Sequence, residues 1–173
     1  MQVDKTQVRA VKPFVGMLSK EEQLFDEIKK ILEEFLGPTD AESPVWPWYH
    51  SDYYENEMGK GLKRKFLFFL DLINPEKLPD IKTRAIEIER KYMEDGRRRI
   101  NIDPGYIHPA KVVLSTRKDY SHRIYLRDGV YAEVTLHYLD HSFQPFPHTY
   151  PDFKSEEYIE LFNKIRGDLV NRG

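Results

Sequence analysis

The stretch VKPFVGMLSKEEQLFDEIKKILEEFLGP, residues 11–38, decides the fold. Its first eight residues form an apolar run that is typical of a β-strand. Apolar residues then recur every three or four positions from Leu24 to Leu36, which predicts an amphipathic helix. Ser19 and Glu22 predict a capping box at the start of that helix, and the Gly-Pro pair after Leu36 predicts its end. The chain therefore opens with a strand that leads directly into a helix.

The segments that follow complete a first half of the fold. Residues 43–54 are aromatic and extended in character, and residues 62–73 read as a strongly apolar strand. A second amphipathic helix begins near Ile81 and ends at Gly96, and residues 99–103 alternate between polar and apolar as a fourth strand does. The resulting order, β-α-β-β-α-β, predicts the split arrangement called ferredoxin-like.

The second half of the chain has the pattern of an antiparallel meander. Strands are expected at residues 110–115, 122–127 and 130–138, and Asp128-Gly129 is a strong hairpin-turn signal between the last two. Three prolines then break regular structure, and Ser155 caps a final amphipathic helix. We therefore predict one α+β domain over residues 1–173, in which a C-terminal hairpin or meander and a last helix extend a ferredoxin-like core.

Composition sets the class of protein. The 27 basic and 29 acidic side chains leave a formal charge of −2, which gives no global attraction to nucleic acid or to an anionic membrane. No apolar run approaches the roughly 20 residues that a bilayer span needs. Cysteine is absent and residues 1–12 lack an apolar signal segment, so we expect a cytoplasmic location. Sparse Asn and Gln beside abundant Lys, Glu and Arg suggest a thermophilic source.

The Asp128-Gly129 turn brings two titratable residues together. A two-residue turn with regular pairing places His122 and Glu133 on one face of the hairpin as diagonal neighbours, with Arg123 on the other face. A carboxylate beside an imidazole fixes the tautomer of the ring, as a general acid–base needs. The alternative is a half-exposed cross-strand pair that stabilises the sheet by about 0.2–1 kcal/mol.

Further polar residues surround this pair. Arg99, Asn101 and Asp103 are predicted to share one face of their strand, where they would grip a ligand with phosphate or carboxylate groups. An internal salt-bridge network is the alternative. Lys111 and Arg117 lie nearby in the sequence and join the candidate ligand-binding residues.

Three segments resemble the core signature of a bacterial family catalogued only as a domain of unknown function. They are RRRINIDPGY (residues 97–106), KDYSHRIYL (118–126) and GVYAEVTL (129–136). Residues 53–59 and 149–152 are similar to its flanking motifs, so the resemblance covers most of the chain. Ile102 stands where the family usually has leucine, and His148 stands near a tryptophan position. The resemblance implies a soluble bacterial protein with a site region common to the family, and it implies no reaction.

Familiar cofactor and metal motifs are missing. The P-loop, the Rossmann glycine pattern and the Gly-x-Ser-x-Gly elbow do not occur. His137, Asp140, His141 and His148 have a spacing that fits no common ligand set. We therefore expect neither a metal nor a cofactor.

Two hypotheses for function remain. The first is a small-ligand-binding protein or enzyme with a polar site on the sheet formed by residues 97–137, taking a small polar or phosphorylated ligand. Its candidate acid–base groups are His122, Glu133 and Asp103, and its candidate ligand-binding groups are Arg99, Asn101, Lys111, Arg117 and Arg123. The second is a nucleic-acid or protein interaction module. It would use the basic patches at residues 60–65 and 97–99 with aromatics at 46–54, which also suit a homodimer contact.

Overall fold

The computed structural model describes residues 7–50 and 53–172. Its elements, in chain order, are β1 (Lys12–Ser19), α1 (Gln23–Leu36), β2 (Thr39–Glu42), β3 (Trp46–Pro47), α2 (Glu55–Met58), β4 (Lys63–Phe69), η1 (Pro75–Lys77), α3 (Leu78–Lys91), β5 (Asn101–His108), β6 (Lys111–Thr116), β7 (Arg123–Arg127), β8 (Val130–Leu139), β9 (Ser142–Pro145), η2 (Pro151–Lys154) and α4 (Glu156–Asn171). No helix in these two ranges is long and apolar enough to cross a bilayer.

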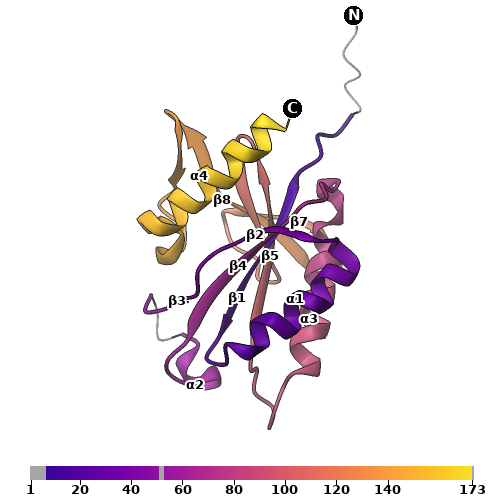
Figure 1. Cartoon of the computed structure of the whole chain (residues 1–173), viewed down its shortest axis with the longest axis vertical. Helices are drawn as coiled ribbons and strands as arrows, with labels where there is room; N and C mark the ends of the chain where they lie inside the picture. The colour runs from indigo at the N-terminus through magenta and orange to yellow at the C-terminus, as the bar shows by residue number, and fades with distance from the viewer. Residues whose placement is uncertain (1–6, 51–52, 173) are drawn as a thin grey trace, which may run out of the picture.

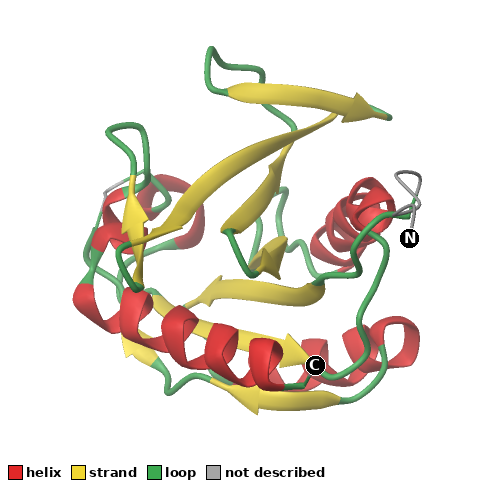
Figure 2. Cartoon of the chain, turned by 90° about the horizontal axis from the view of Figure 1, so that it is seen from above, coloured by secondary structure: helices red, strands yellow, loops and turns green. Residues whose placement is uncertain are grey.

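The strands of the described residues form one large antiparallel sheet, as expected of a mixed α and β fold. Its order is β2-β4-β1-β5-β6-β8-β7, with β3 added beside β4 and β9 beside β8. Both β1 and β2 run antiparallel to β4, so they run parallel to each other with β4 between them. In the same way β1 lies between β4 and β5. Figure 2 shows the strands crossing at widely different angles, which is the twist expected of a large sheet.

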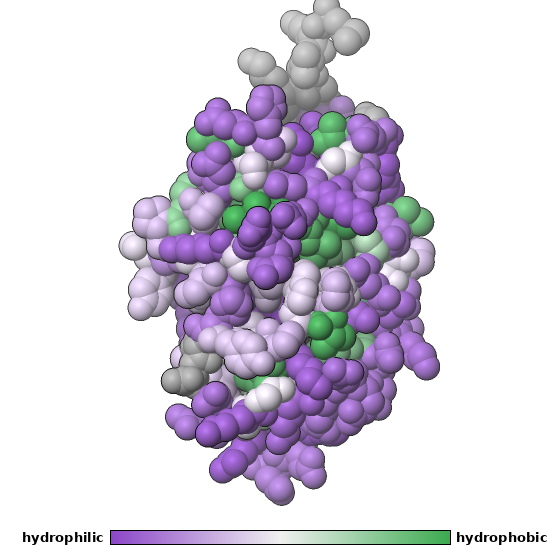
Figure 3. All heavy atoms as spheres, turned by 60° about the vertical axis from the view of Figure 1, so that its left-hand side comes forward, coloured by the Kyte–Doolittle hydropathy of each residue, from purple (hydrophilic) through white to green (hydrophobic). Residues whose placement is uncertain are grey.

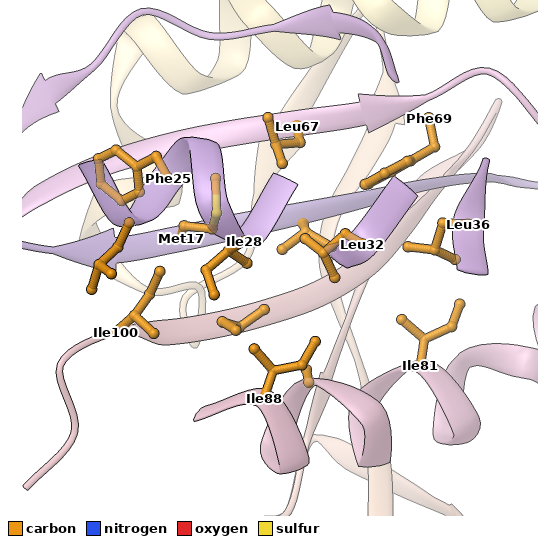
Figure 4. Close-up of a cluster of buried hydrophobic side chains, with 14 residues drawn as sticks. Met17, Phe25, Ile28, Leu32, Leu36, Leu67, Phe69, Ile81, Ile88 and Ile100 are labelled. Carbon is orange, nitrogen blue, oxygen red and sulfur yellow. The ribbon is translucent and has the colours of Figure 1, made fainter. Parts of the chain in front are cut away.

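Helices cover both faces of the first part of this sheet. Helices α1 and α3 lie together on one side and α4 lies on the other (Figure 1). Alternation along β4 supplies both cores, because Leu67 and Phe69 pack against α1 and α3 while Phe66 and Phe68 pack against α4. Figure 4 shows the first of these cores, where side chains of α1 and α3 meet those of β1 and β4. Burial on both faces explains why these strands read as continuous apolar runs.

The start of α1 differs from the prediction. The helix begins at Gln23, and no side chain caps it. The Ser19 hydroxyl instead donates to the carbonyl oxygen of Arg99 at 2.7 Å and accepts from the amide of Glu21 at 3.1 Å. The predicted capping box is therefore wrong, because Ser19 ends β1 and binds a distant loop. The Gly-Pro stop is confirmed, with Gly37 at φ 84°.

Several strand boundaries also differ. β4 ends at Phe69 instead of residue 73, and β5 runs to His108 instead of residue 103. The extended segment predicted at residues 43–54 contributes only the short β3, while β2 precedes it and α2 follows it; residues 51–52 of that segment lie outside the described ranges. The proline-rich stretch contains the unpredicted strand β9, which follows a tight turn at Asp140-His141 with positive φ at both residues.

The last helix agrees with the prediction. Ser155 is the N-cap of α4, and its hydroxyl accepts from the amide of Tyr158. Tyr158, Phe162, Ile165 and Leu169 are buried, as their spacing indicates. The second predicted amphipathic helix is present as α3, but it ends at Lys91 and not at Gly96.

Candidate functional site

A fork between β5 and β6 creates the space for a site. Residues 105–108 of β5 pair with residues 111–114 of β6, whereas residues 101–104 pair with β1 alone. β6 continues through Thr116 in its pairing with β8, so the two strands separate beyond this point. The Ser115 hydroxyl donates to the carbonyl oxygen of Pro104 at 2.7 Å and holds the base of the fork.

Gly105 permits the close packing just below the fork. A Cβ atom there would lie 2.3 Å from the carbonyl oxygen of Val113 and 2.6 Å from the ring of Phe14. Both distances are far inside van der Waals contact. The Asp-Pro-Gly sequence at residues 103–105 thus joins the start of β5, which β6 leaves unpaired, to the rest of β5, which pairs closely with β6.

A cavity of about 810 Å³ lies at this fork. Its walls come from segments far apart in the sequence: four aromatic residues before and at the start of α2, Arg64 of β4, one side of α3, the start of β5, the end of β6 with the loop that follows it, Glu133 of β8, and residues in and before η2. The four aromatic residues are Trp48, His50, Tyr53 and Tyr54. Surveyed small-molecule sites fall between roughly 300 and 1,000 Å³, so the volume suits a small ligand.

Six of the candidate residues line this cavity and two do not. Those that line it are Asn101, Asp103, Arg117, His122, Arg123 and Glu133. Arg99 precedes β5, pairs with Glu21 at 2.8 Å and lines a separate cavity of about 660 Å³. Lys111 lies at the other end of β6, opposite His137. The expectation that Arg99 shares a strand face with Asn101 and Asp103 is therefore wrong.

His122 and Glu133 are in direct contact. The Nε2 atom of His122 lies 2.9 Å from Oε1 of Glu133. The same carboxylate oxygen accepts from Nε of Arg123 at 3.2 Å, and Oε2 accepts from the hydroxyl of Thr135 at 3.1 Å. Glu133 is only 2% exposed, whereas the His122 side chain is 24% exposed. A buried, fully bonded carboxylate therefore holds a partly accessible imidazole.

This contact forms in a different register from the predicted one. Arg127 faces Val130 as expected, but a shift between Tyr125 and Arg127 then places Arg123, not Ile124, opposite Glu133. Regular pairing predicts Arg123 on the face of the hairpin opposite to Glu133. In the structure Arg123 instead lies beside the Glu133 carboxylate. His122 reaches the carboxylate from the turn just before β7.

Stacked rings support the imidazole from behind. The His122 ring stacks on His148 with centroids 4.2 Å apart, His148 stacks on Phe146 at 5.0 Å, and Phe146 stacks on His137 at 4.3 Å. Nε2 of His148 contacts the carbonyl oxygen of Val134 at 3.0 Å, which fixes that ring. The column orients His122. Among the described residues, no group of three His, Asp or Glu side chains is arranged to hold a metal.

The opposite wall of the cavity carries a buried network of charges. Arg64, only 4% exposed, lies 3.2 Å from a carboxylate oxygen of Asp152 and 3.6 Å from one of Asp103. The ammonium group of Lys82 lies 3.7 Å from the other oxygen of Asp103. Asn101 donates to Asp103 at 2.7 Å. These pairs leave Nε of Arg64 as a buried nitrogen without a hydrogen-bond partner among the described residues.

Glu89 completes this wall from α3. It accepts from the amide of Ile102 at 2.7 Å, which belongs to the part of β5 that β6 leaves unpaired. Burial raises the pKa of Glu89, and the nearby Lys82 partly opposes that effect. Sequence reasoning missed Lys82, Glu89 and Asp152. The first two were detectable, because they fall on the same helical stripe as the buried Ala85.

Comparison with known proteins identifies a family and nothing more specific. The family model of DUF4416, described as a domain of unknown function, matches residues 9–168. Neither the curated proteins nor the solved structures contain a match.

Proposed function

Because the chain belongs to the DUF4416 family, whose description names no activity, we propose from the site itself that it is a small-ligand enzyme with His122 as its general acid–base. The observation that carries this proposal is the convergence of six predicted polar residues on one cavity, with the His122–Glu133 contact of 2.9 Å inside it. Polar residues on an unrelated solvated surface would have no reason to meet in this way.

The geometry around His122 suits proton transfer. A carboxylate only accepts, so Nε2 of His122 carries the hydrogen of this contact. The other ring nitrogen, Nδ1, has no hydrogen-bond partner among the described residues. It is therefore the atom that exchanges a proton with a ligand, while Glu133 stabilises the protonated ring. Glu133 is a positioning residue in this scheme, since its own oxygens are occupied by His122, Arg123 and Thr135.

The opposite wall would orient the ligand. Asp103 is 31% exposed although it contacts both Arg64 and Lys82, so its carboxylate remains accessible from the cavity. Asn101 and Asp103 bond to each other, which fixes the amide and carboxylate in one orientation. Preorganised polar groups of this kind hold a substrate without reorganisation during the reaction.

The interaction-module hypothesis has less support. Most of its cations are paired with acids: Lys63 with Glu22, Lys65 with Glu42, Arg98 with Glu57 and Arg99 with Glu21. Arg64 is buried, and Trp46 stacks on Tyr158 at 5.3 Å. On the face seen in Figure 3, hydrophilic residues predominate and hydrophobic ones form small separate patches, so that face offers no broad apolar docking surface.

The strand order supports a further proposal about the fold. Two strand–helix–strand units, β1-α1-β2 and β4-α3-β5, each have an antiparallel strand inserted between their parallel strands. This order supports our proposal of a ferredoxin-like core, whose units are split in the same way, and the continuous sheet supports the proposal of a single domain. A cytoplasmic location, a thermophilic source and a homodimer stay predictions.

A ligand screen tests the proposed function. The protein would be heated with a library of phosphate esters, carboxylates, sugars, amino acids and nucleotides, and each stabilising compound would be incubated with protein and followed by NMR. We expect a compound that is converted, and we expect His122→Gln to slow its conversion by about 100-fold or more while it still binds. His141→Asn is the matched control, because His141 is exposed in a turn outside the cavity.

Two results would overturn the proposal. One is conversion at the same rate by the wild-type protein and His122→Gln. The other is that no compound of the library binds in the cavity. If a ligand binds in the cavity and is not converted, the proposed binding site stands and the proposed enzymatic activity is refuted.

A further inference from the structure

The charges inside the cavity are already paired with one another. Arg123 lies against Glu133, Arg64 against Asp152, and Lys82 near Asp103. An added ligand charge would therefore not be neutralised by the interior without breaking one of these buried pairs.

The rim of the cavity is different. Its exposed lining residues include three cations, Arg90, Arg117 and Lys118, and no acid. The guanidinium groups of Arg90 and Arg117 have no hydrogen-bond or ion-pair partner in the described parts of the chain. The whole protein carries a net charge of −2, so this rim is a local excess of positive charge. Such an excess attracts an anion to the mouth.

The same rim carries exposed aromatic rings. Tyr53, Tyr120 and Tyr150 come from three separate segments and are 63%, 64% and 47% exposed. Cationic side chains contact each of these rings. Nζ of Lys118 lies 4.9 Å from the ring centroid of Tyr53, and Cζ of Arg123 lies 5.2 Å from that of Tyr120. Arg123 also donates to the hydroxyl of Tyr150 at 2.7 Å. Exposed aromatic rings of this kind are platforms for stacking a planar ring.

We propose that this rim selects a phosphate ester that carries a planar ring, a ligand of mononucleotide size, and this inference rests on the proposed small-ligand site. The ring stacks on the rim tyrosines, and the phosphate meets Arg117 and Lys118, which lie three and two positions before Tyr120. Several cations without an acid favour a dianion over a single carboxylate. The cavity of about 810 Å³ has room for such a ligand.

Calorimetric titration tests the two halves of the ligand separately. The probes are the 5′-monophosphates of adenosine, guanosine, cytidine and uridine, the four nucleosides, and ribose 5-phosphate. We expect at least one monophosphate to bind about tenfold or more tightly than both its nucleoside and ribose 5-phosphate, since base stacking alone is worth roughly a factor of ten.

Matched variants assign that preference to the rim. Tyr120→Leu should weaken the monophosphate by about tenfold and leave ribose 5-phosphate unchanged. Tyr49→Leu is its control, because Tyr49 is 86% exposed and does not line the cavity. Arg117→Gln should weaken both phosphates, and Arg97→Gln, an exposed cation outside this cavity, should weaken neither.

Four outcomes overturn the ligand class: no monophosphate binds, ribose 5-phosphate binds as tightly as all of them, the nucleosides bind as tightly, or Tyr120→Leu and Tyr49→Leu behave alike. Binding of an eight-residue single-stranded RNA more than tenfold tighter than any monophosphate would also overturn it, in favour of a nucleic-acid surface. Conversion of a ring-free compound that depends on His122 would leave the proposed function standing while the ligand class fails. If a monophosphate binds at the rim and the wild-type protein and His122→Gln convert it at the same rate, the ligand class stands and the acid–base function of His122 is refuted.

Discussion

Replacing Glu133 by glutamine should destabilise the protein by about 3 kcal/mol. The Glu133 and Arg123 side chains are 2% and 5% exposed, and Oε1 of Glu133 lies 3.2 Å from Nε of Arg123, so this is a buried ion pair. Removal of one partner from such a pair costs about 3–5 kcal/mol, because it leaves an uncompensated buried charge. We take the low end because the glutamine oxygen still accepts one hydrogen bond. For a chain of this size, the loss corresponds to a fall in Tm of about 6–12 °C.

Urea unfolding at pH 7, followed by tryptophan fluorescence, measures this loss directly. Glu160→Gln is the control, since Glu160 is an exposed glutamate of α4, and it should change the free energy of unfolding by less than about 0.5 kcal/mol. Adding Arg123→Met to Glu133→Gln should restore part of the stability, because loss of both charges removes the uncompensated one. A loss below about 1 kcal/mol for Glu133→Gln, with no recovery in the double variant, would show that the pair is solvated and would refute this reasoning.

Three other predictions concern the fork, α3 and the surface. Gly105→Ala should lower the free energy of unfolding in urea by several kcal/mol, because the new Cβ would lie 2.3 Å from the carbonyl oxygen of Val113. Gly167→Ala in α4 is the control: its Cβ meets nothing within 4 Å, so it should stabilise the protein by about 0.5–1 kcal/mol. Equal effects of the two substitutions would refute the close approach at Gly105. The raised pKa of Glu89 means that the folded protein holds a proton which the unfolded chain releases, so stability falls as pH rises from the unfolded value toward the folded one. Glu89→Gln should therefore be at least as stable as wild type at pH 7 and lose that advantage near pH 4 in calorimetry, and a variant clearly less stable at pH 7 would contradict the burial argument. Single-stranded RNA should bind weakly near physiological salt in fluorescence anisotropy, and submicromolar affinity with a steep salt dependence that Arg98→Glu abolishes would reverse the ranking of the two hypotheses.

Local patterns determined much of the secondary structure. Helix α4 and its Ser155 cap follow from residues within one or two turns of each other. The Asp128-Gly129 turn has φ values of 53° and 75°, as its sequence predicts. The turn at Asp140-His141 adopts a similar backbone without glycine, so its sequence carries no comparable signal. Elements whose stabilising contacts lie close together in the chain were therefore predictable.

Long-range competition decided the rest of the local structure. Ser19 has a favourable capping sequence, yet its hydroxyl binds the carbonyl of Arg99, 80 residues away. The hairpin register shifts between Tyr125 and Arg127, and the type of turn alone does not encode such an irregularity. At Ser19 a tertiary contact therefore outweighs a local capping preference worth about 1 kcal/mol.

The sequence by itself determined that His122 and Glu133 would be near one another, because a two-residue turn links their strands. It could not determine that Glu133 is buried and bonded to Arg123 and Thr135 as well, since the predicted register places Arg123 on the other face. Only the tertiary structure brings β4, α3 and η2 to the fork between β5 and β6, and so places Arg64, Lys82 and Asp152 in the same cavity. Those contacts join residues far apart in the chain, and no local spacing or turn geometry specifies them.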